Sequence, residues 1–125
     1  LKNLSKSKNK ITLSIDTSSV REGTMKIDIN KNKLLYLGNE AKIASGNYIG
    51  IMKIKKSACK ILIKSMKSII NKSNNFYFTE SINRIIDKKI YPVNYQDVKN
   101  KFWIEIDDMK DLILARKKIK RGKII

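Results

Sequence analysis

The apolar residues change their period near residue 55, and that change constrains the fold of this chain more than any other feature. Before it, apolar residues alternate with polar ones or run together in stretches that predict β-strands, at residues 10–16, 24–30, 33–38 and 47–54. The turn-like sequence at 31–33 joins two of these strands into an expected hairpin. After it, the apolar positions of 58–70 recur three and four residues apart, which is typical of a helix with one buried face.

The remaining half of the chain predicts further elements: a helix at 79–89, an edge strand at 90–95 beside Pro92, a strand at 102–107 and a helix at 108–121. Ser57 and Asp108 are the expected N-caps, and Asp111 suits the first turn of the last helix. The order β-β-β-β-α-α-β-β-α indicates a mixed α/β class with a hairpin insertion. It holds too few βα units for a complete doubly wound sheet, so half of a larger fold is expected.

Length and composition limit the classes of protein that remain. The 125 residues suit one domain, whose polar ends at 1–9 and 118–125 are expected to fray. No apolar run is long enough to span a bilayer, and the N-terminus has no signal-like segment, so we expect a cytoplasmic protein. The single cysteine, Cys59, excludes an internal disulfide, and the absence of histidine excludes Ser–His and Cys–His catalysis. Because the chain begins at Leu1 rather than Met, we expect a fragment.

The net charge of +17 suggests a polyanionic partner, such as nucleic acid or an anionic surface. Only four of the 28 basic residues are Arg, whereas specific phosphate and base recognition favours the Arg fork. Lys, Ile and Asn, which have A/T-rich codons, make up close to half of the chain, so coding bias also accounts for the lysines. Any nucleic-acid binding is therefore expected to be unspecific.

The predicted strand at 102–107 carries the most chemistry. Alternation places Phe102, Ile104 and Ile106 on one face, and Trp103, Glu105 and Asp107 on the other. The two carboxylates would lie about 7 Å apart at their backbones, near the end of a strand, where they could hold a hard cation. Alternatively, Glu105 is solvated and Asp107 helps to cap the following helix. Trp103 could equally well pack in the core.

Three motifs, together with the strands and hairpin before them, resemble the closing part of nucleotidyltransferases with a sugar-nucleotidyltransferase-like fold. They are GNYIGIMKI at 46–54, FTESINRII at 78–86 and KFWIEIDDMKDLILAR at 101–116. The choline-phosphate cytidylyltransferase-like branch is the most similar, and the W-I-E-I-D motif is the most specific part. The resemblance implies the C-terminal half of a Rossmann-like mixed sheet, with the N-terminal half of the same domain as a missing partner.

The same resemblance implies an activity and a set of site residues. A nucleoside triphosphate, most simply CTP, would donate a nucleotidyl group to a phosphorylated small acceptor (phosphocholine, an aminoalkylphosphonate or a sugar phosphate) and release pyrophosphate. Mg²⁺ would be the cofactor, held by Asp107 or, less favoured, Glu105. Acceptor contacts would come from four further side chains: Asn47, Tyr48, Glu80 and Trp103.

Departures from the family pattern also matter. The Gly-rich loop that holds the triphosphate does not occur, so we expect this chain alone to be inactive and assign it no catalytic residue. Asn47 replaces an acidic residue of the family motif, and Ser81 replaces an Asp. The rival interpretation is a non-catalytic basic module that binds nucleic acid or an anionic surface. Such a module has no need of Trp103, Glu105 and Asp107 at a strand end, and the lysines are scattered rather than clustered.

Overall fold

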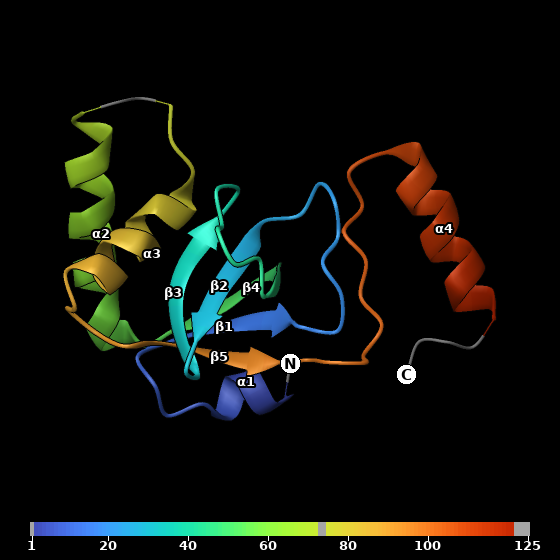
Figure 1. The fold of residues 1–125 in the computed structure, drawn as a ribbon, viewed down its shortest axis with the longest axis horizontal. Helices are drawn as coiled ribbons and strands as arrows, with labels where there is room; N and C mark the ends of the chain where they lie inside the picture. The colour runs from blue at the N-terminus through green and yellow to red at the C-terminus, as the bar shows by residue number, and fades with distance from the viewer. Residues whose placement is uncertain (1, 73–74, 122–125) are drawn as a thin grey trace.

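The computed structural model describes residues 2–72 and 75–121 as a mixed α/β fold around one five-stranded sheet (Figure 1). The strands are β1 (Ile11–Asp16), β2 (Lys26–Asn30), β3 (Lys33–Gly38), β4 (Gly46–Ile54) and β5 (Val93–Asp97). They lie in the order β3-β2-β4-β1-β5. β1 and β5 are parallel, and the other neighbouring pairs are antiparallel. The predicted fold class and the edge position of β5 are confirmed.

The predicted hairpin is formed by β2 and β3. Lys31 and Asn32, at its turn, have φ angles of 47° and 60°, which suit the twist of a two-residue hairpin turn. β2 also pairs with the start of β4, where Lys26 faces Asn47 and Ile27 faces Gly46. The hairpin therefore extends the sheet beyond β4.

Two helices follow β4 and lie together on one side of the molecule (Figure 1): α2 (Lys56–Ile70) and α3 (Phe78–Asp87). α3 packs against β3 and β5, and α2 packs against α3. Leu62 of α2 and Ile82 of α3 belong to the same buried core as Leu13 of β1. Both helices were predicted from their three- and four-residue spacing. Ser57 is not the cap of α2, because the helix begins one residue earlier and Lys55 occupies the N-cap position without a side-chain bond.

The two ends of the chain differ from expectation in part. Residues 2–6, which were expected to fray, form the short helix α1 (Lys2–Lys6), whose Leu4 is buried. The last helix, α4 (Met109–Lys120), begins as predicted: Asp108 is its N-cap and accepts a hydrogen bond from the backbone N–H of Asp111. The end of the basic tail, at 122–125, lies outside the described residues. No helix in the described part of the chain is long and apolar enough to cross a bilayer.

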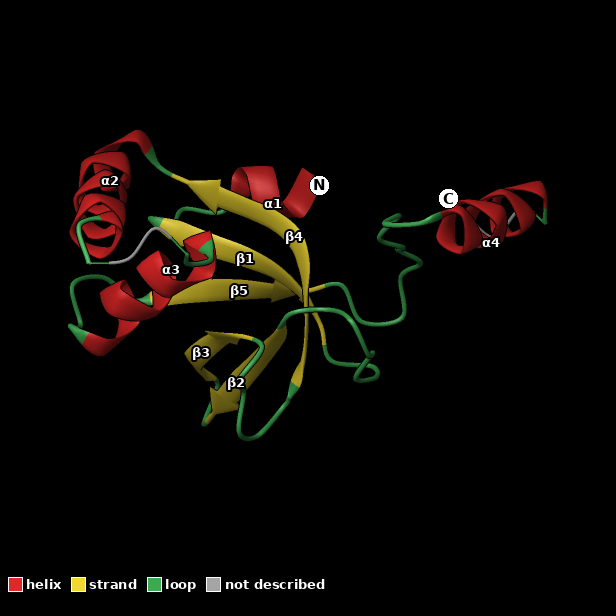
Figure 2. Ribbon diagram, turned by 90° about the horizontal axis from the view of Figure 1, so that it is seen from above, coloured by secondary structure: helices red, strands yellow, loops and turns green. Residues whose placement is uncertain are grey.

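The prediction of a strand at 102–107 is wrong. The described residues form no strand there; the segment instead leads from β5 to α4, which lies apart from the sheet (Figure 2). Phe102 and Ile106, expected in the core, are 37% and 52% exposed. The alternating pattern is typical of a strand, but a strand also needs a neighbouring strand, and none of the described residues supplies one.

Candidate functional site

A buried carboxylate marks the carboxyl end of β1. Asp16 is 1% exposed and ends β1, which lies between β4 and β5 in the sheet. Its Oδ1 accepts hydrogen bonds from the backbone N–H and the hydroxyl of Ser18, at 2.9 and 2.5 Å. Its Oδ2 accepts one from the indole Nε1 of Trp103 at 2.7 Å. Burial alone would raise the pKa of Asp16, but these bonds and the nearby Arg21 guanidinium outweigh it, so the pKa is lowered.

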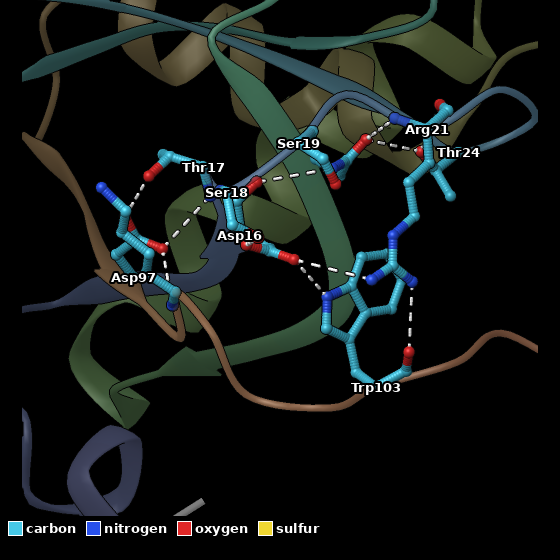
Figure 3. Close-up of polar contacts among 10 residues, drawn as sticks. Asp16, Thr17, Ser18, Ser19, Arg21, Thr24, Asp97 and Trp103 are labelled. Atoms are coloured by element: carbon cyan, nitrogen blue, oxygen red, sulfur yellow. Dashed lines mark hydrogen bonds and ion pairs between the residues drawn. The ribbon is translucent and has the colours of Figure 1, made fainter. Parts of the chain in front are cut away.

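Arg21 and Trp103 stack beside that carboxylate, as Figure 3 shows. The guanidinium carbon of Arg21 lies 4.1 Å from the centre of the indole ring, and its Nη1 donates to the carbonyl of Trp103 at 3.1 Å. Its Nη2 is 3.8 Å from Oδ2 of Asp16. A guanidinium over an indole face is favourable in both charge and contact area. The three side chains therefore tie the segment that carries Glu105 to the end of β1.

Asn47 holds the loop that follows β1. Its Oδ1 accepts hydrogen bonds from the backbone N–H of Arg21 at 2.8 Å and from the hydroxyl of Thr24 at 2.9 Å. Its Nδ2 donates to the carbonyl of Ser19 and, at 3.4 Å, to that of Asp16. Asn47 is 0% exposed. A direct contact with an acceptor, which the sequence suggested, is not available to a side chain with no exposed surface; Asn47 instead shapes the loop.

A second link joins the ends of the two parallel strands. The backbone N–H of Thr17 donates to Oδ1 of Asp97 at 3.2 Å, and its hydroxyl donates to Oδ2 (Figure 3). The backbone N–H of Lys99 also donates to Oδ1 of Asp97, at 3.0 Å. The loops after β1 and β5 are thus fastened together at the carboxyl ends of parallel strands, where α/β sheets bind their ligands.

Glu105 and Asp107 lie between two cavities at this end of the sheet and line both of them. The smaller, of about 230 Å³, is also lined by Tyr48 of β4 and by Tyr77, the residue before α3. The larger, of about 620 Å³, contains Arg21 and Trp103 in its wall. Tyr48 is buried, and burial raises its pKa to about 12, so its hydroxyl stays protonated.

The predicted site residues are therefore only partly brought together. Tyr48, Glu105 and Asp107 share one cavity, and Trp103 lines the neighbouring one. Glu80 lines a third, larger cavity between β3 and α3, and its carboxylate accepts a hydrogen bond from the backbone N–H of Tyr77 at 3.2 Å. That bond belongs to the capping box of α3.

The carboxylates of Glu105 and Asp107 make no hydrogen bond or ion pair within the described part of the chain. The cap of α4 uses Asp108 and Asp111 instead, with Asp107 contributing only its backbone N–H. The alternative role of Asp107 as a capping side chain is therefore excluded. No group of three or more acidic, cysteine or histidine residues that could hold a metal occurs among the described residues. Two carboxylates still fit Mg²⁺, which is commonly held by one or two of them together with water and substrate phosphates.

Sequence reasoning missed the residues that organise the site. Asp16 was read only as the last residue of a strand, and Arg21 and Asp97 were not assigned a role. An acidic residue at the carboxyl end of a strand is the one signal that the sequence offers for Asp16 and Asp97. Nothing in the sequence paired either of them with Trp103 or Thr17.

No family model matches the chain, and no curated protein matches its sequence. Among solved structures it is similar to the inositol-1-phosphate CTP transferase from T. maritima, with a TM-score of 0.69 and 20% sequence identity. The match covers 96% of this chain and 49% of that one, so the chain spans about half the length of the protein it resembles. The nucleotidyltransferase fold expected from the sequence is thereby confirmed. The choline-phosphate branch stays a prediction, because the matched transferase is one of inositol-1-phosphate.

Proposed function

We propose that this chain is the C-terminal half of a cytidylyltransferase, which transfers CMP from CTP to a phosphorylated small acceptor. The observation that carries the proposal is the pair of unpartnered carboxylates, Glu105 and Asp107, at the carboxyl end of a nucleotidyltransferase-like sheet. One alternative use, the cap of α4, is taken by Asp108. The other alternative, a Glu105 that is only solvated, is tested by the substitutions below. Both side chains are exposed, so they are open to a cation that binds in the cavity.

The chemistry needs little proton transfer. A phosphate oxygen of the acceptor attacks the α-phosphorus of CTP, a new P–O bond forms, and pyrophosphate leaves with the electrons of the broken bond. The acceptor phosphate is already ionised, so the absence of histidine does not count against this reaction. When bound, Mg²⁺ would neutralise phosphate charge, and Asp107 and Glu105 would hold it.

The other residues of the site would bind and orient. Tyr48 and Tyr77 line the same cavity as Glu105 and Asp107, and their rings would pack against the body of the acceptor. Trp103, through its bond to Asp16, and Arg21, through its bond to the carbonyl of Trp103 and its ion pair with Asp16, would keep the two carboxylates in position. Glu80, at a separate cavity, would contact only an acceptor that extends past Tyr77.

The test uses the natural polypeptide that contains this chain. We expect it to release pyrophosphate from CTP and Mg²⁺ with one of three acceptors: phosphocholine, an aminoalkylphosphonate or a sugar phosphate. Asp107→Asn should reduce turnover by about 100-fold or more and raise the Mg²⁺ requirement, because the amide keeps the shape but loses the charge. Glu105→Gln should have a smaller effect. Asp87→Asn is the matched control, at an exposed residue that lines the cavity beside Glu80. Its turnover and Mg²⁺ requirement should stay near those of wild type.

Three outcomes would contradict the proposal. Normal Mg²⁺ dependence in both Asp107→Asn and Glu105→Gln would remove this end of the sheet from the active site. Pyrophosphate release by the 125-residue chain alone would contradict its role as half of a domain. Tight binding to one DNA sequence at physiological salt, in excess competitor, would favour a basic nucleic-acid module instead.

A further inference from the structure

The outer face of α2 carries a row of lysines, which we call the lysine stripe. Its members are all exposed: Lys56, Lys60, Lys64 and Lys67. They follow one another at steps of four, four and three residues, which keep them on one side of the helix. The buried residues Ala58, Leu62 and Ser65 lie on the opposite side. The fold therefore gathers these lysines, although basic residues are scattered along the chain as a whole.

The charge of the lysine stripe is not neutralised within the described part of the chain. α2 contains no acidic residue, and none of the four ammonium groups makes an ion pair or a hydrogen bond with another described residue. Lysines four residues apart on a helix repel each other, and Lys56 lies in the first turn, where the helix dipole disfavours a positive charge. The stripe therefore does not stabilise its own helix, and an anionic surface laid against it would relieve the repulsion.

Two isoleucines lie beside the lysine stripe and indicate which kind of anionic surface it fits. Ile63 and Ile70 are 50% and 45% exposed. Ile63 lies three residues after Lys60 and four before Lys67, and Ile70 lies three residues after Lys67, so both border the stripe. Nucleic acids are bound by Arg forks and stacking aromatic rings, and α2 has neither. Lysines bordered by exposed aliphatic side chains suit an anionic lipid bilayer, where charged headgroups meet acyl chains.

α2 lies at the end of the fold that is remote from the candidate site. Figures 1 and 2 both show α2 at one extreme of the molecule, with α3 on its inner side. The strands β1 and β5 point toward the opposite extreme, where α4 lies. None of the four lysines lines the cavity of Glu105 and Asp107. A surface that holds α2 would therefore leave that cavity open.

We propose that the outer face of α2 is a peripheral docking surface for an anionic lipid bilayer. The lysine stripe contacts phosphate-bearing headgroups, and Ile63 and Ile70 enter the boundary between headgroups and acyl chains. The opposite side of α2 stays packed in the protein core, so docking does not require the helix to leave the domain. The inference goes beyond the proposed function, because it concerns the surface on which the protein works and not the group that it transfers.

The test measures how the natural polypeptide that contains this chain cosediments with lipid vesicles. Vesicles of phosphatidylcholine with roughly one third phosphatidylglycerol should bind it at least about tenfold more tightly than vesicles of phosphatidylcholine alone. Lys60→Gln combined with Lys64→Gln should weaken binding to the anionic vesicles at least about twentyfold, because each lysine at such a surface contributes about fivefold. Lys33→Gln combined with Lys42→Gln is the matched control. It removes the same charge from exposed positions outside α2 and should weaken binding less than about twofold.

A further variant, Ile63→Gln, separates a bilayer from a nucleic acid. It removes an exposed apolar side chain without changing the charge, so binding to the anionic vesicles should fall at least about threefold. Binding to a single-stranded DNA oligonucleotide depends chiefly on charge and should not change. Circular dichroism of every variant should match that of wild type, because each substituted side chain is exposed.

Three results would overturn the docking surface. The first is equal binding to anionic and neutral vesicles, or binding to neither. The second is an equal loss of vesicle binding in the Lys60 and Lys64 pair and in the Lys33 and Lys42 pair, since the effect would then follow net charge alone. The third is binding to single-stranded DNA that requires Lys60 and Lys64 without any binding to anionic vesicles, which would assign the lysine stripe to a nucleic acid.

Discussion

The indole Nε1 of Trp103 donates a hydrogen bond to Oδ2 of Asp16 at 2.7 Å, although the two residues lie 87 positions apart in the chain. Asp16 ends a central strand, whereas Trp103 belongs to a segment with no strand partner among the described residues. This single bond, with the Arg21 stack beside it, fastens that segment to the sheet.

Trp103→Phe should lower the free energy of unfolding by about 1–3 kcal/mol, because it leaves one oxygen of a buried carboxylate without its donor. Phe102→Leu, at an exposed neighbouring position, is the control and should change the free energy of unfolding by less than about 0.5 kcal/mol. Urea unfolding followed by circular dichroism measures both. Equal effects of the two substitutions would show that the indole N–H contributes nothing.

The lowered pKa of Asp16 predicts a stability change in acid. The folded-state pKa lies below the ordinary value of 3.8, so the unfolded state binds more protons as the pH falls. The contribution of Asp16 is therefore fully present above that value and is lost as the pH falls through the folded-state pKa. Urea unfolding of wild type and Asp16→Asn, between about pH 2 and pH 6, should show their difference shrinking below about pH 4. A pH-independent difference would contradict this.

Asn47→Asp, which restores the acidic residue of the family motif, should destabilise the protein rather than improve a binding site. The new carboxylate would lose both donated bonds and face the carbonyls of Ser19 and Asp16. A buried charge left in this way costs several kcal/mol. Thermal unfolding measures the loss, and Asn39→Asp, at an exposed position, is the control. A melting temperature equal to that of wild type would contradict the role of Asn47 in holding the loop.

Asp28 anchors the loop between β3 and β4 and should be sensitive to loss of its charge. Its carboxylate accepts hydrogen bonds from the backbone N–H groups of Lys42, Ile43 and Ala44, each at 2.8 Å. Asp28→Asn turns one acceptor into a donor, so we expect a loss of about 1–3 kcal/mol in unfolding free energy and faster exchange of the three amides. The exposed Glu40→Gln should change neither quantity.

Local pattern was sufficient for most elements of the fold. The alternation at 10–16 and the three- and four-residue spacing at 58–70 report which side of each segment is apolar, and a strand or helix follows directly. The hairpin, the edge position of β5 beside Pro92 and the cap at Asp108 were predictable for the same reason, because each depends on residues close together in the chain. The sequence also showed Glu105 and Asp107 as candidate metal ligands.

The tertiary structure alone decided how those residues are used. Residues 102–107 have a strand-like pattern, yet a strand exists only where another chain segment accepts its hydrogen bonds. Asn47 matched a binding motif, but the loop after β1 folds over it and takes every bond its amide can make. The link from Trp103 to Asp16 joins distant positions, and local periodicity carries no information about which distant groups will meet. The sequence alone therefore determined the separate elements, whereas packing decided which of their polar side chains hold the fold and which remain free for chemistry.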